Sequence, residues 1–360
     1  MTLGQLTHIK SSGIPTWPFD YELRPGNDPR VRREEATVNG KTYSYVVGEP
    51  SDTPPVDTVF LIHGFPDLGF GWRCQVPFLI GLGLRVVVPD MLGYAASDSP
   101  KDLRQFSRKA ISDDIKELAA ILVGHQPIIL GGHDWGGALV WRIALWHPKL
   151  VKAVFSVCTP FFNIPTSRFV SLEQHLADGN LTHFQYQLQF KGPDVENVIQ
   201  GKEKIRQFLS AMYGGTDNNG ELGFSTEQGV LLHKLPEIGS PPLLSEEELD
   251  YYVDQYMLQE APQLRGPLNW YRMSQIDWEE ELSMAENKPV LEMPTLFIAA
   301  TEDIALPPSL SAGMERHMTN LTRGEVQSSH WALTQAPDAV NEQLGKWLSR
   351  FLKLDARSVL

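Results

Sequence analysis

The segment that most constrains the fold is a glycine-rich turn near the middle of the chain. Residues 131–137 read GGHDWGG, after the apolar run 127–130 and before a helical pattern that begins at Ala138. A strand that turns sharply into a helix exposes its central residue at the carboxyl end of a sheet, and flanking glycines fit because no side chain has room there. The central residue here is Asp134, where serine is usual. A carboxylate can displace a leaving group from saturated carbon and form an ester with the substrate.

Apolar runs alternate with helical patterns in two stretches of the chain. This alternation predicts a parallel sheet covered by helices on both faces. Together with the turn at Asp134, it predicts an α/β fold class with an α/β-hydrolase core, a mostly parallel eight-stranded sheet with helices on both faces. The expected strands are 56–62, 84–88, 127–130, 151–157, 295–300 and 325–328, and the expected helices include 70–82, 107–123 and 338–352.

The middle of the chain has a different pattern. Between about Pro160 and Pro289 the sequence is helical in character, rich in Gln, Tyr, Trp and Glu, and interrupted by loop-like composition at 214–220 and 239–242. We predict a helical cap inserted between the sixth and seventh strands. The predicted division is core 1–159, cap 160–289 and core 290–360. The stretch before Arg33, with several prolines and glycines, predicts an irregular wrap on the core.

Composition narrows the possible partners and locations. The net charge of −13 argues against nucleic acid and anionic membrane surfaces as partners. The two cysteines form no disulfide framework and favour a reducing compartment. No apolar run approaches the roughly 20 residues that span a bilayer, and residues 1–18 lack a signal-peptide pattern. We expect a cytoplasmic protein, since the ending Ser358-Val359-Leu360 matches a peroxisomal signal only weakly. The oligomeric state stays open, with a homodimer as one hypothesis.

A carboxylate nucleophile needs a base that activates water for the second step. Of the ten histidines, His330 follows the last predicted strand and lies on a loop before the final helix. In this fold the chain order nucleophile, acid, histidine places the base at that loop. His147 lies near a helix end, where a histidine is better explained as a charge favourable to the helix C-terminus.

The acid partner of His330 should orient the imidazole and stabilise its charged form. Asp303 comes just after the predicted strand 295–300, at a loop that faces the histidine. Glu302 is the competitor, and we expect it to be a solvated neighbour.

Asp134 has an alternative interpretation, because an aspartate before a helix often only caps that helix. The flanking glycines and the preceding apolar strand favour the nucleophile role for Asp134.

The loop 63–67, His-Gly-Phe-Pro-Asp, follows another expected strand. In this fold that loop supplies one backbone N–H of an oxyanion hole, here from Phe65, and the residue after the nucleophile, Trp135, supplies the other. The two amides would hold the charge on the ester carbonyl oxygen when water attacks. The substrate pocket is expected to be lined by Phe65, Trp135, Phe161 and Trp331.

Taken together, these motifs resemble the soluble epoxide hydrolases of the α/β-hydrolase fold. The resemblance runs from about Thr58 to the C-terminus. In the cap, 184–188 resembles the family's first tyrosine segment and 269–272 its second, which implies that Tyr186 and Tyr271 point at the epoxide oxygen. The core segments that carry the resemblance are 63–66, 132–137, 139–141 and 159–161.

The same resemblance implies a cis peptide bond between Phe65 and Pro66, a rare geometry outside X-Pro bonds. Two positions depart from the family pattern. Ala95 and Ser329 stand where the family usually carries glycine, and the first should alter the turn in which it lies. Neither departure removes a catalytic group.

The chemistry of epoxide opening agrees with two tyrosines in the cap. An alkoxide is a poor leaving group unless it is protonated or strongly hydrogen-bonded, and phenols with an ordinary pKa near 10 can donate throughout the reaction. Tyr186 and Tyr271 would serve this role. Tyr251, Tyr252 and Tyr256 are expected only to pack.

The predicted function is hydrolysis of a hydrophobic epoxide, a small-molecule partner, to a vicinal diol. A hydroxyalkyl ester would form on Asp134 and be hydrolysed by water that His330 and Asp303 activate. No metal or cofactor is expected, because no ligand set is recognisable. Two alternatives stay open: a haloalkane dehalogenase that uses the same aspartate, and a non-catalytic homologue that binds a ligand without turnover.

Overall fold

The computed structural model describes residues 22–164, 168–287 and 289–352. Its centre is one eight-stranded sheet with the order β1-β2-β4-β3-β5-β6-β9-β10. The pairs β1–β2 and β2–β4 are antiparallel, and the other five pairs are parallel. The predicted α/β-hydrolase fold class is therefore confirmed. The strands are β1 (Val31–Val38), β2 (Lys41–Gly48), β3 (Asp57–Ile62), β4 (Leu84–Pro89), β5 (Ile128–His133), β6 (Val151–Val157), β9 (Thr295–Ala300) and β10 (Leu321–Val326).

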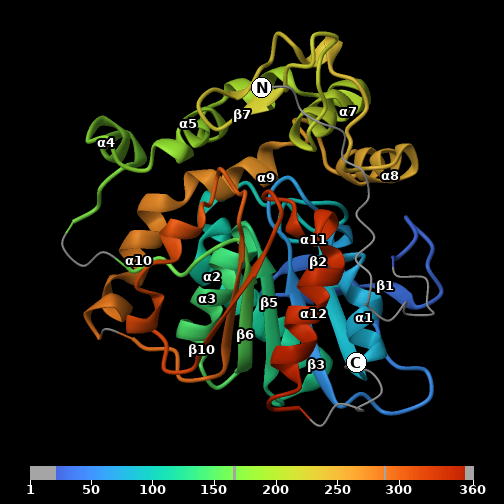
Figure 1. The fold of residues 1–360 in the computed structure, drawn as a ribbon, viewed down its shortest axis with the longest axis vertical. Coiled ribbons are helices and arrows are strands. Elements are labelled where there is room, and N and C mark those ends of the chain that lie inside the picture. The colour runs from blue at the N-terminus through green and yellow to red at the C-terminus, as the bar shows by residue number, and fades with distance from the viewer. Residues whose placement is uncertain (1–21, 165–167, 288, 353–360) are drawn as a thin grey trace.

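Helices cover the sheet on both sides (Figure 1). The helices α1 (Gln75–Gly81) and α12 (Pro337–Leu348) lie on one side, whereas α2 (Arg108–Val123) and α3 (Trp135–Trp146) lie on the other. The central strands β3 and β5 are almost wholly buried, which explains their continuous apolar runs. This packing fixes the carboxyl ends of the parallel strands at one edge, where ligands bind in open α/β sheets.

Several predicted boundaries are wrong, one of them at an edge of the sheet. The last strand is β10, which ends at Val326, and not 325–328. It was misplaced because an edge strand half exposed to water carries polar residues and lacks an apolar run. The expected helix 70–82 is a 3-10 turn at Gly69–Trp72 followed by α1. The closing helix ends at Leu348.

The described part of the predicted irregular N-terminal stretch is irregular, except that a strand begins two residues before Arg33. Residues 22–30 contain no helix or strand, but β1 begins at Val31 and pairs with β2 along its whole length. These two antiparallel strands were missed because charged residues interrupt β1 and only one of its faces is buried. The part of the wrap before residue 22 and the C-terminal tripeptide lie outside the described residues.

Between β6 and β9 the chain is mostly helical, and we call residues 160–289 the cap segment. Figure 1 shows several of its helices gathered at one end of the molecule, beyond the sheet. A hairpin of two short strands, β7 (Phe224–Ser225) and β8 (Gly229–Val230), interrupts the helices. The helices are α4 (Leu172–Ala177), α5 (Tyr186–Lys191), α6 (Asp194–Val198), α7 (Gly201–Met212), α8 (Glu246–Tyr256), α9 (Arg265–Asn269) and α10 (Ser274–Glu286). Among the described ranges, no helix has the length and apolar character that a membrane crossing requires.

Candidate active site

Asp134 lies at the sharp turn between β5 and α3. Its backbone has φ +53° and ψ −124°, in the region that non-glycine residues rarely adopt and that costs on the order of 1–3 kcal/mol. Neighbouring glycines make the turn sterically feasible: a Cβ on Gly132 would lie 2.3 Å from the Gly136 oxygen, and one on Gly136 would lie 2.1 Å from the Ile62 oxygen. The Asp134 side chain makes no capping hydrogen bond to α3. The helix-cap interpretation is therefore wrong, and the carboxylate is available for chemistry.

The two oxygens of the Asp134 carboxylate have different partners. The backbone N–H of Phe65 donates to Oδ1 at 2.7 Å, and Nε2 of His330 lies 3.5 Å from Oδ2. A Cβ on Gly64 would come within 2.2 Å of Oδ1, so the loop 63–67 needs its glycine to approach the carboxylate. The Phe65–Pro66 peptide bond is cis, as the resemblance implied. Trp135, the second expected oxyanion donor, begins α3 directly after Asp134, where backbone N–H groups lack helical partners.

His330 is held from its other side by Asp303. Its Nδ1 lies 2.7 Å from Oδ2 of Asp303, and Oδ1 of that carboxylate accepts from the backbone N–H groups of Ala305 and Leu306 at 2.9 and 2.8 Å. Asp303 is buried, whereas Glu302 is exposed and accepts a hydrogen bond only from Gln327 in the described structure. The structure thus brings Asp134, His330 and Asp303 into one chain of contacts and leaves Glu302 outside it.

The electrostatics of these three groups are coupled. Burial opposes charge on each of them, but their mutual attraction wins. The His330 imidazolium holds the pKa of Asp134 and of Asp303 below the ordinary value, with help from the Phe65 and Leu306 amides. Conversely, the carboxylates of Asp303 and Asp134 raise the pKa of His330 well above its ordinary value. Before substrate binds, the site therefore holds one imidazolium between two carboxylates.

Tyr186 and Tyr271 come from the cap segment and lie beside each other, next to the residues that flank the Asp134 carboxylate. Their ring centroids are 6.3 Å apart, and the Tyr271 ring packs edge-on against the rings of Phe65 and Trp135, each at 5.1 Å. Both tyrosines are buried. Burial, and to a smaller degree the Asp134 carboxylate, raises the pKa of both phenols, so both keep their proton at neutral pH.

The remaining predicted pocket residues divide into two groups. The ring of Trp331 lies 5.7 Å from His330 and stacks on Tyr213 at 4.1 Å. Phe161 packs 5.1 Å from His317 and 6.5 Å from Trp141, and its role in the pocket stays a prediction.

Sequence reasoning missed an apolar wall of the site. It is formed by Phe190, one helical turn after Tyr186 and 5.1 Å from the rings of Phe65 and Tyr271, and by Phe224.

Two cap tyrosines do more than pack. The Tyr252 hydroxyl donates to Asp67 at 2.5 Å, and the Tyr256 hydroxyl donates to the Pro66 carbonyl oxygen at 2.7 Å. Tyr213 also donates to Asp67, at 3.2 Å. The bonds from Tyr252 and Tyr256 tie helix α8 to the loop that carries the Phe65 amide, and the bond from Tyr213 ties the end of α7 to the same loop. The prediction that Tyr252 and Tyr256 only pack is wrong, because the sequence cannot show which polar group a buried hydroxyl reaches. It is wrong for Tyr251 too, whose hydroxyl accepts from Arg33 at 3.0 Å.

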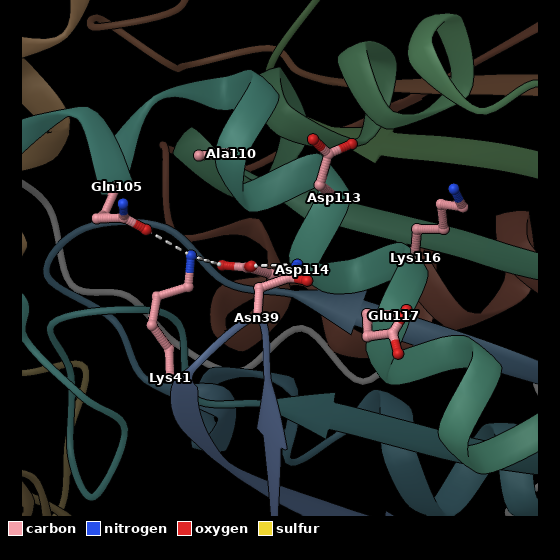
Figure 2. A pocket seen from close by; sticks show the side chains of 8 residues that line it. All are labelled: Asn39, Lys41, Gln105, Ala110, Asp113, Asp114, Lys116 and Glu117. Carbon is pink, nitrogen blue, oxygen red and sulfur yellow. Dashed lines mark hydrogen bonds and ion pairs between the residues drawn. The ribbon is translucent and has the colours of Figure 1, made fainter.

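A separate polar depression lies between β2 and α2 and shares no residue with this site (Figure 2). Its central ammonium, Lys41 Nζ, lies 2.8 Å from Asp114 and donates to Gln105 at 2.9 Å, while Asn39 donates to the same Asp114 carboxylate at 2.9 Å. Because these groups satisfy one another, the depression offers little to a ligand.

A family model described as "alpha/beta hydrolase fold" matches residues 57–337. The chain belongs to the α/β hydrolase fold family. It is 39% identical over 340 residues to epoxide hydrolase srdG of Neurospora crassa, covering 91% of this chain and 98% of that protein. It is 35% identical to the bifunctional epoxide hydrolase 2 of Rattus norvegicus, covering 81% of this chain and 51% of the rat protein.

A solved structure, epoxide hydrolase A from Mycobacterium thermoresistibile, superposes with a TM-score of 0.73 at 26% identity, covering 90% of this chain and all of that one. Epoxide hydrolase VrEH1 from Vigna radiata shows the same fold with a TM-score of 0.73 at 23% identity, covering 91% of this chain and all of that one. The resemblance to the soluble epoxide hydrolases that the motifs carried is confirmed by these relatives.

Proposed function

We propose that this protein hydrolyses a hydrophobic epoxide to a vicinal diol through a covalent hydroxyalkyl ester on Asp134. The observation that carries the proposal is the position of the Asp134 carboxylate. It lies between the Phe65 amide and His330, and its charge contributes to raising the pKa of the two buried phenols, Tyr186 and Tyr271. The cap segment, with the boundaries 160–289, is proposed to close over this site. A cytoplasmic location and a homodimer stay predictions.

In the first step one oxygen of Asp134 attacks an oxirane carbon. Oδ1 already accepts the Phe65 N–H, so Oδ2 is the better nucleophile and Oδ1 becomes the ester carbonyl oxygen. The C–O bond of the epoxide breaks, and the developing alkoxide takes a hydrogen bond and then a proton from Tyr186 or Tyr271. Donors already in place cost no reorganisation as this charge develops.

In the second step water attacks the ester carbonyl carbon. Ester formation removes the charge of Asp134, which is one of the two carboxylates that raise the pKa of His330. The imidazolium then loses its proton more readily, and this proton restores the tyrosine that protonated the alkoxide. The neutral His330 can then take a proton from water while Asp303 retains its contact with Nδ1. The charge on Oδ1 is held by the Phe65 and Trp135 amides. Collapse of this intermediate breaks the ester C–O bond, and the departing diol oxygen takes the proton that His330 holds. The carboxylic acid left on Asp134 then gives its proton to His330, which restores the free site.

The apolar wall around the site indicates the class of substrate. The rings of three phenylalanines contact the two cap tyrosines: Phe65 contacts Tyr271, Phe224 contacts Tyr186, and Phe190 contacts both. Such a wall favours an epoxide with an aryl or alkyl substituent, because hydrophobic groups gain about 25 cal/mol per Å² on leaving water.

The two alternatives need other features. A haloalkane dehalogenase stabilises a leaving halide, and Phe65 offers no side-chain donor to a halide. In such an enzyme the two tyrosines would have no role. A ligand-binding protein without turnover has little use for the buried Asp134 carboxylate in contact with a histidine, since burying charge is costly.

One experiment separates these functions. The purified protein is given an aryl epoxide and, separately, a primary haloalkane of similar size, and diol and halide are quantified. We expect diol and no halide, and no diol with Asp134→Asn. Halide release without diol would establish the dehalogenase, and tight binding of either compound without product, unchanged in Asp134→Asn, would establish the binding protein.

A further inference from the structure

Three side chains that can bind a metal ion meet at the candidate catalytic histidine. One ring nitrogen of His133, one ring nitrogen of His330 and the sulfur of Cys158 all lie within 4.8 Å of one another. The sheet brings His133 and Cys158 together. His133 ends β5 and is the register partner of Val157, the last residue of β6 before Cys158. The loop before α11 (Ala332–Gln335) then adds His330.

The existing bonds of this cluster show how close the three groups are. A ring nitrogen of His133 lies 2.8 Å from the backbone carbonyl oxygen of His330, and the Cys158 thiol donates to the same oxygen at 3.4 Å. The rings of His133 and His330 are 5.0 Å apart. His133 is 1% exposed, and its Nδ1 has no hydrogen-bond partner within the described structure. Such an orphaned buried nitrogen is rare in native proteins and needs an explanation.

Two histidines and a cysteine are ligands that Zn²⁺ prefers, at about 2.0–2.1 Å for nitrogen and 2.3 Å for sulfur. A tetrahedral site of those lengths separates neighbouring ligand atoms by roughly 3.5 Å. Atoms already within 4.8 Å therefore need shifts of only about 1 Å. Asp303, whose Oδ2 lies 2.7 Å from His330, can supply a fourth ligand.

The charge around the cluster also favours a dication. Oδ2 of Asp303 lies 2.7 Å from Nδ1 of His330, and Oδ2 of Asp134 lies 3.5 Å from its Nε2. Two carboxylates therefore adjoin one of the three proposed ligands. A divalent cation would balance both.

We propose that His133, Cys158 and His330, with Asp303 as the fourth ligand, form an inhibitory site for a thiophilic divalent cation, best matched by Zn²⁺. On binding, a Zn–S bond replaces the S–H bond of Cys158 and the thiol proton passes to solvent. The ion also takes a ring nitrogen of His330, which displaces any proton there and removes the base. Mg²⁺, which prefers oxygen ligands, should not bind. The inhibition rests on the proposed function, whereas the binding does not.

The test uses full-length protein freed of metal with a chelator. Zn²⁺ is titrated against epoxide hydration, and Cd²⁺, a thiophilic probe, is titrated while the ultraviolet thiolate-to-cadmium charge-transfer band is recorded. Mg²⁺ is the negative control. Cys158→Ser and Cys158→Ala remove the sulfur ligand in two ways, so one variant suffices if the other fails to fold. Cys74→Ser is the matched control, because Cys74 is the other buried cysteine and lies outside the site.

We expect reversible inhibition by Zn²⁺ and a one-to-one Cd²⁺ band in the natural protein and in Cys74→Ser. In the Cys158 variants the band should disappear, and the half-inhibitory Zn²⁺ concentration should rise at least about tenfold, as loss of one ligand predicts. Equal Zn²⁺ sensitivity with and without Cys158 would overturn the proposal, as would a natural protein without the band, or a band without inhibition. If the metal-free protein hydrates no epoxide, the proposed function fails, and the Cd²⁺ band still decides the site.

Discussion

Replacing Asp303 by asparagine tests the coupling between the two halves of the proposed reaction. The carboxylate accepts from Nδ1 of His330 at 2.7 Å and from two backbone amides at 2.9 and 2.8 Å. The asparagine side chain would keep one acceptor oxygen for the amides but would turn an NH₂ group toward Nδ1. The imidazole must then accept at Nδ1 and carry its proton on Nε2, where it cannot act as a base toward water.

The expected loss follows from these contacts. A hydrogen bond to a charged group contributes about 1.5–3 kcal/mol, which corresponds to roughly 10- to 150-fold in the hydrolysis step. The wrong tautomer increases the loss, up to about 10⁴-fold in a protease triad of the same logic. Formation of the ester should slow much less, because Asp303 does not contact Asp134.

Rapid quenching followed by intact-protein mass spectrometry measures both steps in one experiment. With an aryl epoxide, Asp303→Asn should accumulate the ester during turnover, while the natural protein accumulates less. Glu302→Gln is the matched control: it removes the same charge one residue away, from an exposed side chain, and should behave as the natural protein. Equal slowing of both steps in Asp303→Asn, or hydrolysis within about threefold of the natural protein, would refute the reasoning, because the lost hydrogen bond alone predicts more.

Three further predictions concern the cap segment. Tyr186→Phe should slow ester formation by roughly 10- to 150-fold through loss of one hydrogen bond to the alkoxide, with Tyr251→Phe, outside the site, as the unaffected control in the same quench assay. Gly266→Ala should lower the free energy of unfolding by about 1–3 kcal/mol in thermal denaturation, because the new Cβ would lie 2.5 Å from the Cα of Gly93 in the core; unchanged stability would contradict that contact. Burial raises the pKa of Asp277 to about 6 from 3.8. The folded chain therefore holds this proton more tightly, and stability falls as pH rises from about 4 to 6, by about 3 kcal/mol. Denaturant titrations across that range should show that Asp277→Asn loses this contribution, and parallel pH profiles would count against it.

The parts of the fold that the sequence predicted best are those that local chemistry determines. The strands of the buried parallel sheet show as apolar runs, and the glycines around Asp134 mark the turn because a Cβ on Gly132 or Gly136 would meet backbone. The half-exposed β1 and β10 were missed or misplaced, since their polar residues conceal the strand period. Pattern alone cannot identify an edge strand of this kind.

The site was predictable to the extent that chain order reflects the fold. Asp134, Asp303 and His330 follow strands whose carboxyl ends meet, so their convergence could be inferred. That Tyr186 and Tyr271 lie together was implied by resemblance only, because no local sequence motif determines the path of the cap segment. The cluster of His133 with Cys158 was not foreseen, because it depends on the register between β5 and β6. The hydrogen bond from Tyr252 to Asp67 depends in the same way on docking between distant segments.

The central claim is that Asp134 becomes covalently bound to substrate and that His330 is needed only for its release. The most direct test is the intact mass of His330→Gln after incubation with an aryl epoxide, followed by peptide mapping of the modified residue. The account predicts a stable mass increase equal to one epoxide, located on Asp134 and absent from the double variant Asp134→Asn, His330→Gln. A folded His330→Gln protein that gains no mass, or gains it at another residue, would contradict the account.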